Sequence, residues 1–444
     1  MEFSRLKNLF VVLVMITVLT AGVSFSLQNS EDYFTKQAVA VASVQKAGTS
    51  AQNSEPLPPP PPQKLGNPPE IIKAVYVTGW SAGNKSYFNY LSNLFKKTEI
   101  NAVVVDIKDS SGFVSYASGA EEVKKYNLDN DVILDIDALV RFFHGQNIYV
   151  IGRIVVFEDP VYSKARPELA IYNKAKETQP TGSGYPDLTG YPLGRVLWQD
   201  NNGLSWLDPA SKEVWDYNIS LAKDVFYHGF DEINFDYIRF PTDGNTKNTG
   251  FPVWDEKKPM QEIIKEFFQY VRQELAGEKI SADLFGLTTV NTNDMGIGQL
   301  LENAFENFDY IAPMVYPSHY AKNFIGFENP AEYPYEVIKY SMGSAISREK
   351  SFLKKQQDLV IKNSEAEGSP ASEFQKTLSS IPVLRPLARF RPWLQDFDMG
   401  AFYNADMVKK EIKATQDALG YDFSGFMLWN PSNIYTQAAV LKPR

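Results

Sequence analysis

The stretch 231-DEINFDYIRFP-241 decides the fold. Alternation along a strand places Ile233 and Phe235 on one face, and Glu232, Asn234 and Asp236 on the other. A strand that is covered on both faces is normally apolar on both, whereas acids occupy one face here. In a closed barrel that second face meets the interior, where buried acids can be paired with bases.

The rest of the chain repeats the same strand-and-helix unit. From residue 71 onward, short apolar segments alternate with amphipathic stretches, which predicts parallel strands joined by right-handed crossovers. The eight strand candidates are KAVYVTG, NAVVVDIKD, IYVIGRIVVF, FDEINFDYIRF, KISADLFGLT, FDYIAPMVYP, RFRPWLQDF and SGFMLWNPS. Eight such units predict a (β/α)8 TIM barrel over residues 71–444 with enlarged βα loops, and a doubly wound sheet is the alternative.

Two N-terminal segments precede the barrel. Arg5 and Lys7 stand before an uncharged run from Leu9 to Leu27, which predicts a signal peptide or an uncleaved membrane anchor over residues 1–28. Residues 29–70 end in PLPPPPPQKLGNPPE, a composition typical of a disordered, proline-rich linker. We therefore expect an extracytoplasmic barrel that is either secreted or held at the membrane by its N-terminal segment.

Composition excludes several classes of function. The net charge of −9 argues against nucleic acid as a partner, and the absence of cysteine excludes disulfides and thiolate zinc sites. The three histidines, His144, His228 and His319, do not have metal-ligand spacing. We predict no metal and no cofactor.

Charged residues of both signs are expected inside the barrel. Buried charges must be paired and hydrogen-bonded. We therefore expect Arg153 and Lys108 to pair with Glu232 and Asp106, with Asn234 in the same network.

Depth along the strands separates the candidate catalytic acids. Glu232 and Asp236 are four residues apart, about 13 Å along a strand, so Asp236 lies nearer the C-terminal mouth, where such barrels carry their sites. Asp283 on the next strand is the proposed partner. Two carboxyl groups roughly 5 Å apart suit retaining glycoside hydrolysis, and about 6.5–9.5 Å suits inverting hydrolysis. Asp106, Asp109 and Glu232 remain alternatives for the acid.

Aromatic and polar residues near the strand ends suit a sugar site. Flat rings stack on sugar faces, while amides, imidazoles and charged groups bind hydroxyls. Enlarged loops after the third, fourth and sixth strands indicate an open cleft for a polysaccharide or oligosaccharide. The predicted substrate-binding residues are Trp80, Asp106, Arg239, Tyr316, His319, Trp393, Gln395, Trp429 and Asn430.

The stretch GFDEINFDYIRFP, residues 229–241, resembles the bacterial glycoside hydrolase family that carries the label domain of unknown function 4015. The likeness covers about residues 72–440 and includes VYVTGWSAG, VVVDIKDSSG, RIVVFEDP, LDP, FGLTT, IAPMVYPSHY, RPWLQDF and MLWNPSN. The resemblance implies an α-amylase-like barrel, in which the strand-four aspartate, here Asp236, is the nucleophile. Those enzymes carry a glutamate as acid on strand five, where this chain has Asp283.

Two other functions are considered. GWSAG, residues 79–83, matches the G-x-S-x-G nucleophile elbow with Ser81 as nucleophile, but no earlier strand supplies an oxyanion-hole loop. A non-catalytic polysaccharide-binding or wall-scaffold barrel would keep the aromatic residues without needing two convergent carboxylates. The sequence favours an exported glycoside hydrolase that cleaves O-glycosidic bonds.

Overall fold

The computed structural model describes residues 60–176, 195–366 and 387–443. The predicted signal or anchor segment, residues 1–28, and most of the predicted linker lie outside the described residues. Within the described ranges, no helix is both long and apolar enough to cross a membrane.

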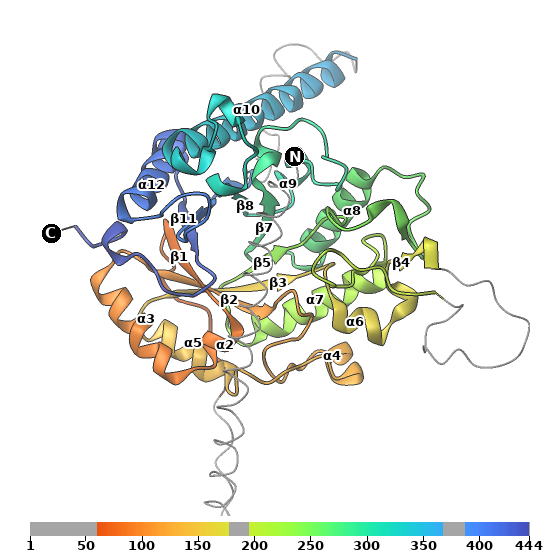
Figure 1. Ribbon diagram of the computed structural model, residues 1–444, viewed down its shortest axis with the longest axis horizontal. Coiled ribbons are helices and arrows are strands. Elements are labelled where there is room, and N and C mark those ends of the chain that lie inside the picture. Colours follow the sequence, from red (N-terminus) through yellow and green to blue (C-terminus); the bar gives the residue numbers. More distant parts are fainter. Residues whose placement is uncertain (1–59, 177–194, 367–386, 444) are drawn as a thin grey trace, which may run out of the picture. The chain divides into compact units, whose positions relative to one another are not determined.

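Eight parallel strands close into a barrel, as predicted, with helices around the outside (Figure 1). The seventh strand is in two pieces, β9 and β10; β9 pairs with β8, and β10 pairs with both β8 and β11, which closes the ring and excludes the doubly wound sheet. The strands are β1 (Ile72–Val77), β2 (Ala102–Lys108), β3 (Tyr149–Val155), β5 (Glu232–Asp236), β7 (Ile280–Phe285), β8 (Tyr310–Met314), β9 (Arg389–Phe390), β10 (Trp393–Gln395) and β11 (Gly425–Trp429).

Helices follow the strands, and several begin at a side-chain cap. Asp135, Ser211 and Asn404 each accept hydrogen bonds from backbone N–H groups in the first turn, which satisfies donors that the helix leaves unpaired. The α-helices are α2 (Gly79–Ala82), α3 (Lys85–Lys97), α4 (Glu121–Tyr126), α5 (Ile136–His144), α6 (Pro160–Ala165), α7 (Lys212–Tyr227), α8 (Met260–Glu274), α9 (Leu301–Ala304), α10 (Pro334–Ala366) and α12 (Ala405–Leu419).

The enlarged loops carry their own short elements. A two-stranded antiparallel sheet of β4 (Tyr172–Asn173) and β6 (Thr249–Gly250) joins the loops that follow β3 and β5. The 3-10 helices are η1 (Pro167–Leu169), η2 (Lys174–Lys176), η4 (Thr246–Asn248), η5 (Gly286–Thr289), η6 (Pro317–His319), η7 (Phe324–Gly326), η8 (Pro330–Glu332), η9 (Gly420–Asp422) and η10 (Gln437–Ala439).

The barrel has one apolar core outside the strands and another inside. Val103, Ile233 and Phe235 belong to the outer core between strands and helices, as the alternation predicts. Tyr76 and Trp393 belong to a separate interior cluster. The acids of β5 share this interior, so the polar face of the opening stretch is the inner face of the barrel.

Lys108 does not join the interior network that we expected. A register shift between Asp106 and Lys108 turns the end of β2, so the Lys108 ammonium lies outside the barrel. There it donates to Asp159 at 2.8 Å and to Asn218 of α7 at 3.0 Å. The extra residue of a bulge leaves no signature in simple alternation, which explains the difference.

Glu232 is paired, but with a residue that the alternation argument left out. Arg391, fully buried between β9 and β10, donates its Nη2 to Glu232. Ser281 also donates to Glu232 at 2.6 Å. The pair forms the floor of the barrel interior.

The last residues of the predicted linker pack against the N-terminal end of the barrel. The Leu65 backbone N–H donates to Asp231, which precedes β5, at 2.6 Å. The Leu65 side chain contacts the interior apolar cluster, and Lys64 pairs with Glu278, which precedes β7. Residues 64–65 are therefore an ordered part of the barrel unit, which extends from Pro60.

Candidate active site

A pocket of about 600 Å³ lies at the C-terminal ends of the strands. Each of the eight barrel strands supplies at least one lining residue, and β7 supplies two: Tyr76, Asp106, Arg153, Asp236, Asp283, Phe285, Met314, Trp393 and Trp429. This is the end of the barrel where strand-borne side chains and βα loops converge on a ligand. No cluster of three metal-ligating side chains is found in the described part of the chain.

Asp236 ends β5, and its carboxylate receives donors on both oxygens. Arg153 contacts Oδ2 with Nη2 at 2.6 Å and with Nε at 3.1 Å. Oδ1 accepts the backbone N–H of Tyr237 at 2.6 Å. Tyr237 has a φ of 52°, a left-handed conformation that is uncommon for a residue other than glycine. All three of these contacts donate hydrogen bonds to the Asp236 carboxylate.

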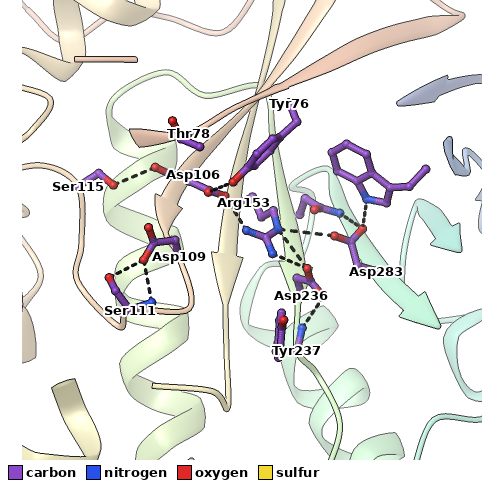
Figure 2. A network of polar contacts seen from close by, with 12 residues as sticks. Tyr76, Thr78, Asp106, Asp109, Ser111, Ser115, Arg153, Asp236, Tyr237 and Asp283 are labelled. Carbon is purple, nitrogen blue, oxygen red and sulfur yellow. Dashed lines mark hydrogen bonds and ion pairs between the residues drawn. The ribbon is translucent and has the colours of Figure 1, made fainter. Parts of the chain in front are cut away.

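Arg153 lies between three carboxyl groups (Figure 2). In addition to Asp236, its Nη1 donates to Asp106 at 2.6 Å, and its Nε lies 3.9 Å from Oδ2 of Asp283. Tyr76 donates its hydroxyl to the other oxygen of Asp106. Burial raises the pKa of Asp106, while the Arg153 charge opposes that rise. Arg153 thus belongs to the predicted network but pairs with Asp106 and Asp236, not with Glu232.

Asp283, on the neighbouring strand β7, has the opposite environment to Asp236. Its Oδ1 accepts from Asn234 at 2.8 Å and from the indole Nε1 of Trp393 at 2.7 Å. Burial raises the pKa of Asp283 well above its usual value, and the charge of Asp236 raises it further. Because Oδ1 already accepts two hydrogen bonds, the proton of the neutral acid belongs on Oδ2.

A chain of hydrogen bonds connects Asp283 to the barrel floor. Asn234 donates to Asp283 and also to Ser281 at 3.0 Å, and Ser281 donates to Glu232. Glu232 is fully buried and ends this chain at Arg391. Glu232 is therefore linked to Asp283 through Ser281 and Asn234.

Aromatic groups cover one side of the pocket. Tyr316 and Trp429 lie with ring centroids 5.5 Å apart at an interplanar angle of 33°, and His319 lies 5.2 Å from Tyr316. Burial lowers the pKa of His319, whose Nδ1 is hydrogen-bonded to Ser318. A neutral imidazole and two rings can bind the faces and hydroxyls of a sugar.

The structure places three of the predicted substrate-binding residues outside this pocket. Trp80 is 68% exposed on α2, and Gln395 is buried, where it accepts from Ser318 and so ties down η6. The Asn430 side chain donates to the carbonyls of Asp396 and Ile434 and accepts from Ser432. The other predicted binding residues, Asp106, Arg239, Tyr316, His319, Trp393 and Trp429, all line the pocket.

The buried ionisable residues that were not predicted include Arg391 and Glu158. Arg391 could have been found because it lies two residues before Trp393 in the same alternation, although Pro392 interrupts the strand. Glu158 follows β3 in the FEDP stretch and is 2% exposed, and its Oε2 has no hydrogen-bond partner among the described residues. Burial raises the pKa of Glu158 to about 8, with a further contribution from Asp200.

Ser81 has no catalytic partner in the structure. It lies in the single-turn helix α2, where its Oγ accepts from Thr78 at 3.0 Å. No histidine or acid is hydrogen-bonded to Ser81 within the described residues. The nucleophile-elbow hypothesis therefore has no geometric support.

The chain was compared with known families and structures. A family model described as "Putative glycosyl hydrolase domain" matches residues 74–358 and 364–435. No curated protein matches the chain. A solved hypothetical protein from Ruminiclostridium thermocellum is 40% identical over 47% of this chain and 96% of its own, with a TM-score of 0.40.

Two solved structures with lower sequence identity cover a larger share of this chain. The PgaB (BpsB) glycoside hydrolase domain from Bordetella bronchiseptica is 13% identical and covers 82% of this chain and 95% of its own, with a TM-score of 0.48. An α-galactosidase from Thermus thermophilus, solved with p-nitrophenyl α-D-galactopyranoside, is 11% identical over 85% of this chain and 61% of its own, with a TM-score of 0.43.

Proposed function

The chain belongs to this glycosyl hydrolase domain family, and we propose that it cleaves an O-glycosidic bond of a polysaccharide or oligosaccharide with Asp236 and Asp283 as its two carboxylates. The observation that carries the proposal is their opposite electrostatic environments within one pocket. Arg153 and the Tyr237 N–H donate hydrogen bonds to the Asp236 carboxylate, whereas burial and the neighbouring charge raise the pKa of Asp283. Glycoside hydrolysis needs one group in each state.

Their separation suits the reaction. The same Arg153 Nε lies 3.1 Å from Oδ2 of Asp236 and 3.9 Å from Oδ2 of Asp283, so these oxygens are no farther apart than the two distances together. That limit includes retaining separations of about 5–5.5 Å and the short end of the inverting range, which begins at about 6.5 Å. Asp236 therefore serves either as the nucleophile or as the base that activates water.

In the proposed reaction, Asp283 gives its Oδ2 proton to the leaving oxygen as the bond to the anomeric carbon breaks. Asp236 then either bonds to that carbon, in which case water deprotonated by Asp283 later breaks the ester and frees Asp236, or takes the proton of a water that attacks the carbon directly. Arg153 holds Asp236 in position and disperses its charge until the sugar cation develops. Tyr316 and Trp429 offer ring faces for the sugar.

We also propose that the enzyme is exported and remains secreted or membrane-anchored. The support is the sequence alone: Arg5 and Lys7 precede the uncharged run from Leu9 to Leu27. Fractionation of producing cells, followed by N-terminal sequencing of the mature protein, tests this assignment. Recovery of the intact chain in the cytoplasm would refute it.

Two isosteric variants test the chemistry. The purified chain is first screened for sugar release from a panel of wall and storage polysaccharides, and then for turnover of nitrophenyl glycosides. Asp236→Asn should lose about 10²–10⁴-fold on both kinds of substrate. Asp283→Asn should lose as much on polysaccharides but much less on nitrophenyl glycosides, whose leaving group needs no acid.

Exposed Asp131 provides the matched control, because Asp131→Asn changes one carboxylate to an amide away from the pocket. Thermal unfolding of each variant shows whether a lost activity reflects a lost fold. Polysaccharide binding with no sugar released from any substrate would favour the binding or scaffold alternative and reject the proposal.

A further inference from the structure

Arg239 is a buried cation in the wall of the pocket. It follows β5 and Tyr237, and only 7% of its surface is exposed. Its guanidinium carbon lies 4.8 Å from the ring centroid of Trp206, 4.9 Å from that of Tyr237 and 4.6 Å from that of Phe285. Three rings therefore enclose the charge and hold it away from bulk water.

Only one of its three nitrogens is used by the protein. Nη1 donates to the Phe240 carbonyl at 3.1 Å and to the Thr242 hydroxyl at 3.2 Å. Nε and Nη2 have no hydrogen bond or ion pair within residues 60–176, 195–366 and 387–443. Neither nitrogen belongs to the fully buried side-chain atoms that lack a partner among the described residues, and Arg239 lines the pocket.

The neighbouring acids attract this cation, but none of those described forms an ion pair with it. Asp236 is bonded to Arg153, and Glu158, with its pKa raised to about 8, is mostly protonated at neutral pH. Asp243, which also lines the pocket, forms no ion pair with Arg239 within 4.0 Å. Burial consequently lowers the pKa of Arg239. A buried cation without a counter-ion is costly, and an anion that entered the pocket would offset that cost.

The unused edge has the shape of a carboxylate site. Nε–H and Nη2–H of a guanidinium point in parallel and match the two oxygens of one carboxylate. Arg153 uses this same pair of nitrogens to hold Asp236 in the same pocket. Arg239 presents an equivalent edge to the empty space, where a substrate group can reach it.

We propose that Arg239 selects a carboxylated sugar by binding the sugar's carboxylate through Nε and Nη2. The inference rests on the proposed glycoside hydrolase function and specifies its substrate as an acidic glycan. The carboxylate can belong to a uronic acid ring or to the lactyl ether of a muramic acid residue, since both present the same planar anion. Asp109 and Asp243 also line the pocket, and their negative charges would repel a carboxylate. Selection of an acidic sugar must therefore come from its direct hydrogen bonds to Arg239 and not from the net electrostatic potential of the pocket.

Binding to paired ligands tests the charge preference. The probes are oligogalacturonides and peptide-free wall glycan strands, each compared with its carboxyl-reduced form, which keeps the rings and linkages but loses the charge. Calorimetry with the full-length Asp283→Asn chain avoids glycan turnover and leaves the Nε and Nη2 edge of Arg153 occupied by Asp236. At least one acidic ligand should bind about tenfold more tightly than its reduced form, and the preference should persist in high salt.

Arg239→Lys provides the matched variant, because it keeps a cation but loses the parallel donor edge. It should abolish the preference while binding the reduced ligand as the parent does. If the parent protein binds the reduced ligands as tightly as the acidic ones or more tightly, the inference is overturned before any Arg239 variant is measured. The same holds if it binds no acidic ligand. A preference that survives in Arg239→Lys would overturn it as well.

The outcomes separate this inference from the function on which it rests. If the wild-type chain releases sugar from neutral polysaccharides and shows no preference for acidic ones, the hydrolase proposal stands and the role of Arg239 is wrong. If acidic ligands bind with the expected preference but no glycan is ever cleaved, Arg239 binds as inferred and the catalytic proposal is wrong.

Discussion

Glu158→Gln should make the protein less sensitive to alkaline pH. Glu158 is 2% exposed, and its Oε2 has no partner among the described residues. Burial raises its pKa from 4.5 to about 8, so the folded chain binds this proton more tightly than the unfolded chain. Stability is therefore fully present below pH 4.5 and is lost as the pH rises from that value through about 8. Glutamine carries no charge at any of these pH values, so the Glu158→Gln protein does not lose this part of its stability.

The expected size follows from the shift. Each pH unit between the unfolded and folded pKa values costs the wild type about 1.4 kcal/mol. Between pH 5 and pH 8 the wild type should lose roughly 3 kcal/mol that Glu158→Gln retains. Other buried acids such as Asp283 titrate in both proteins, so they cancel from the difference.

Urea unfolding followed by tryptophan fluorescence at pH 5, 6, 7 and 8 measures the difference in free energy between the two proteins. Glu306→Gln, at an exposed glutamate, is the control and should give a constant difference across this range. A constant difference for Glu158→Gln as well would mean that Glu158 is already ionised in the folded protein at neutral pH. The argument from burial would then be wrong.

Two further predictions concern the pocket and its floor. Trp393→Phe removes an indole N–H that donates to Asp283 and lowers its pKa. The alkaline limb of the pH–rate profile should therefore move up by about one pH unit. An unchanged alkaline limb would contradict the assignment of Asp283 as the acid. Glu232→Gln leaves Arg391 buried without its carboxylate and should cost about 3–5 kcal/mol in urea unfolding; a loss below about 1 kcal/mol would show that Arg391 finds another partner.

The barrel could be predicted because strand alternation reports which face is covered. Ile233 and Phe235 pack outward, while Glu232, Asn234 and Asp236 face the interior, and the same pattern recurs around the ring. In a closed parallel barrel one face of each strand meets the helices and the other meets the interior, so alternation between apolar and polar residues predicts a barrel. Bulges break the pattern, and Lys108 was misplaced for that reason.

The residues at the pocket were less predictable than the fold. Asp236 and Asp283 lie on strands, so their depth and direction follow from counting residues. Trp80, Gln395 and Asn430 lie at or beyond strand ends, where loop conformation decides direction, and all three lie outside the pocket. The rings around Arg239 come from three places in the chain: Trp206 follows β3, Tyr237 follows β5 and Phe285 ends β7. No local sequence pattern predicts that these three rings meet.

The ordered end of the linker has a geometric consequence for the whole enzyme. Lys64 and Leu65 are fastened near Asp231 and Glu278, at the N-terminal ends of β5 and β7. The pocket opens at the opposite ends of the same strands. The described part of the chain therefore enters the barrel from behind, and a tether, purification tag or fusion partner joined directly at Pro60 would attach at the back. A bulky glycan could then approach the front of an immobilised enzyme without meeting its support.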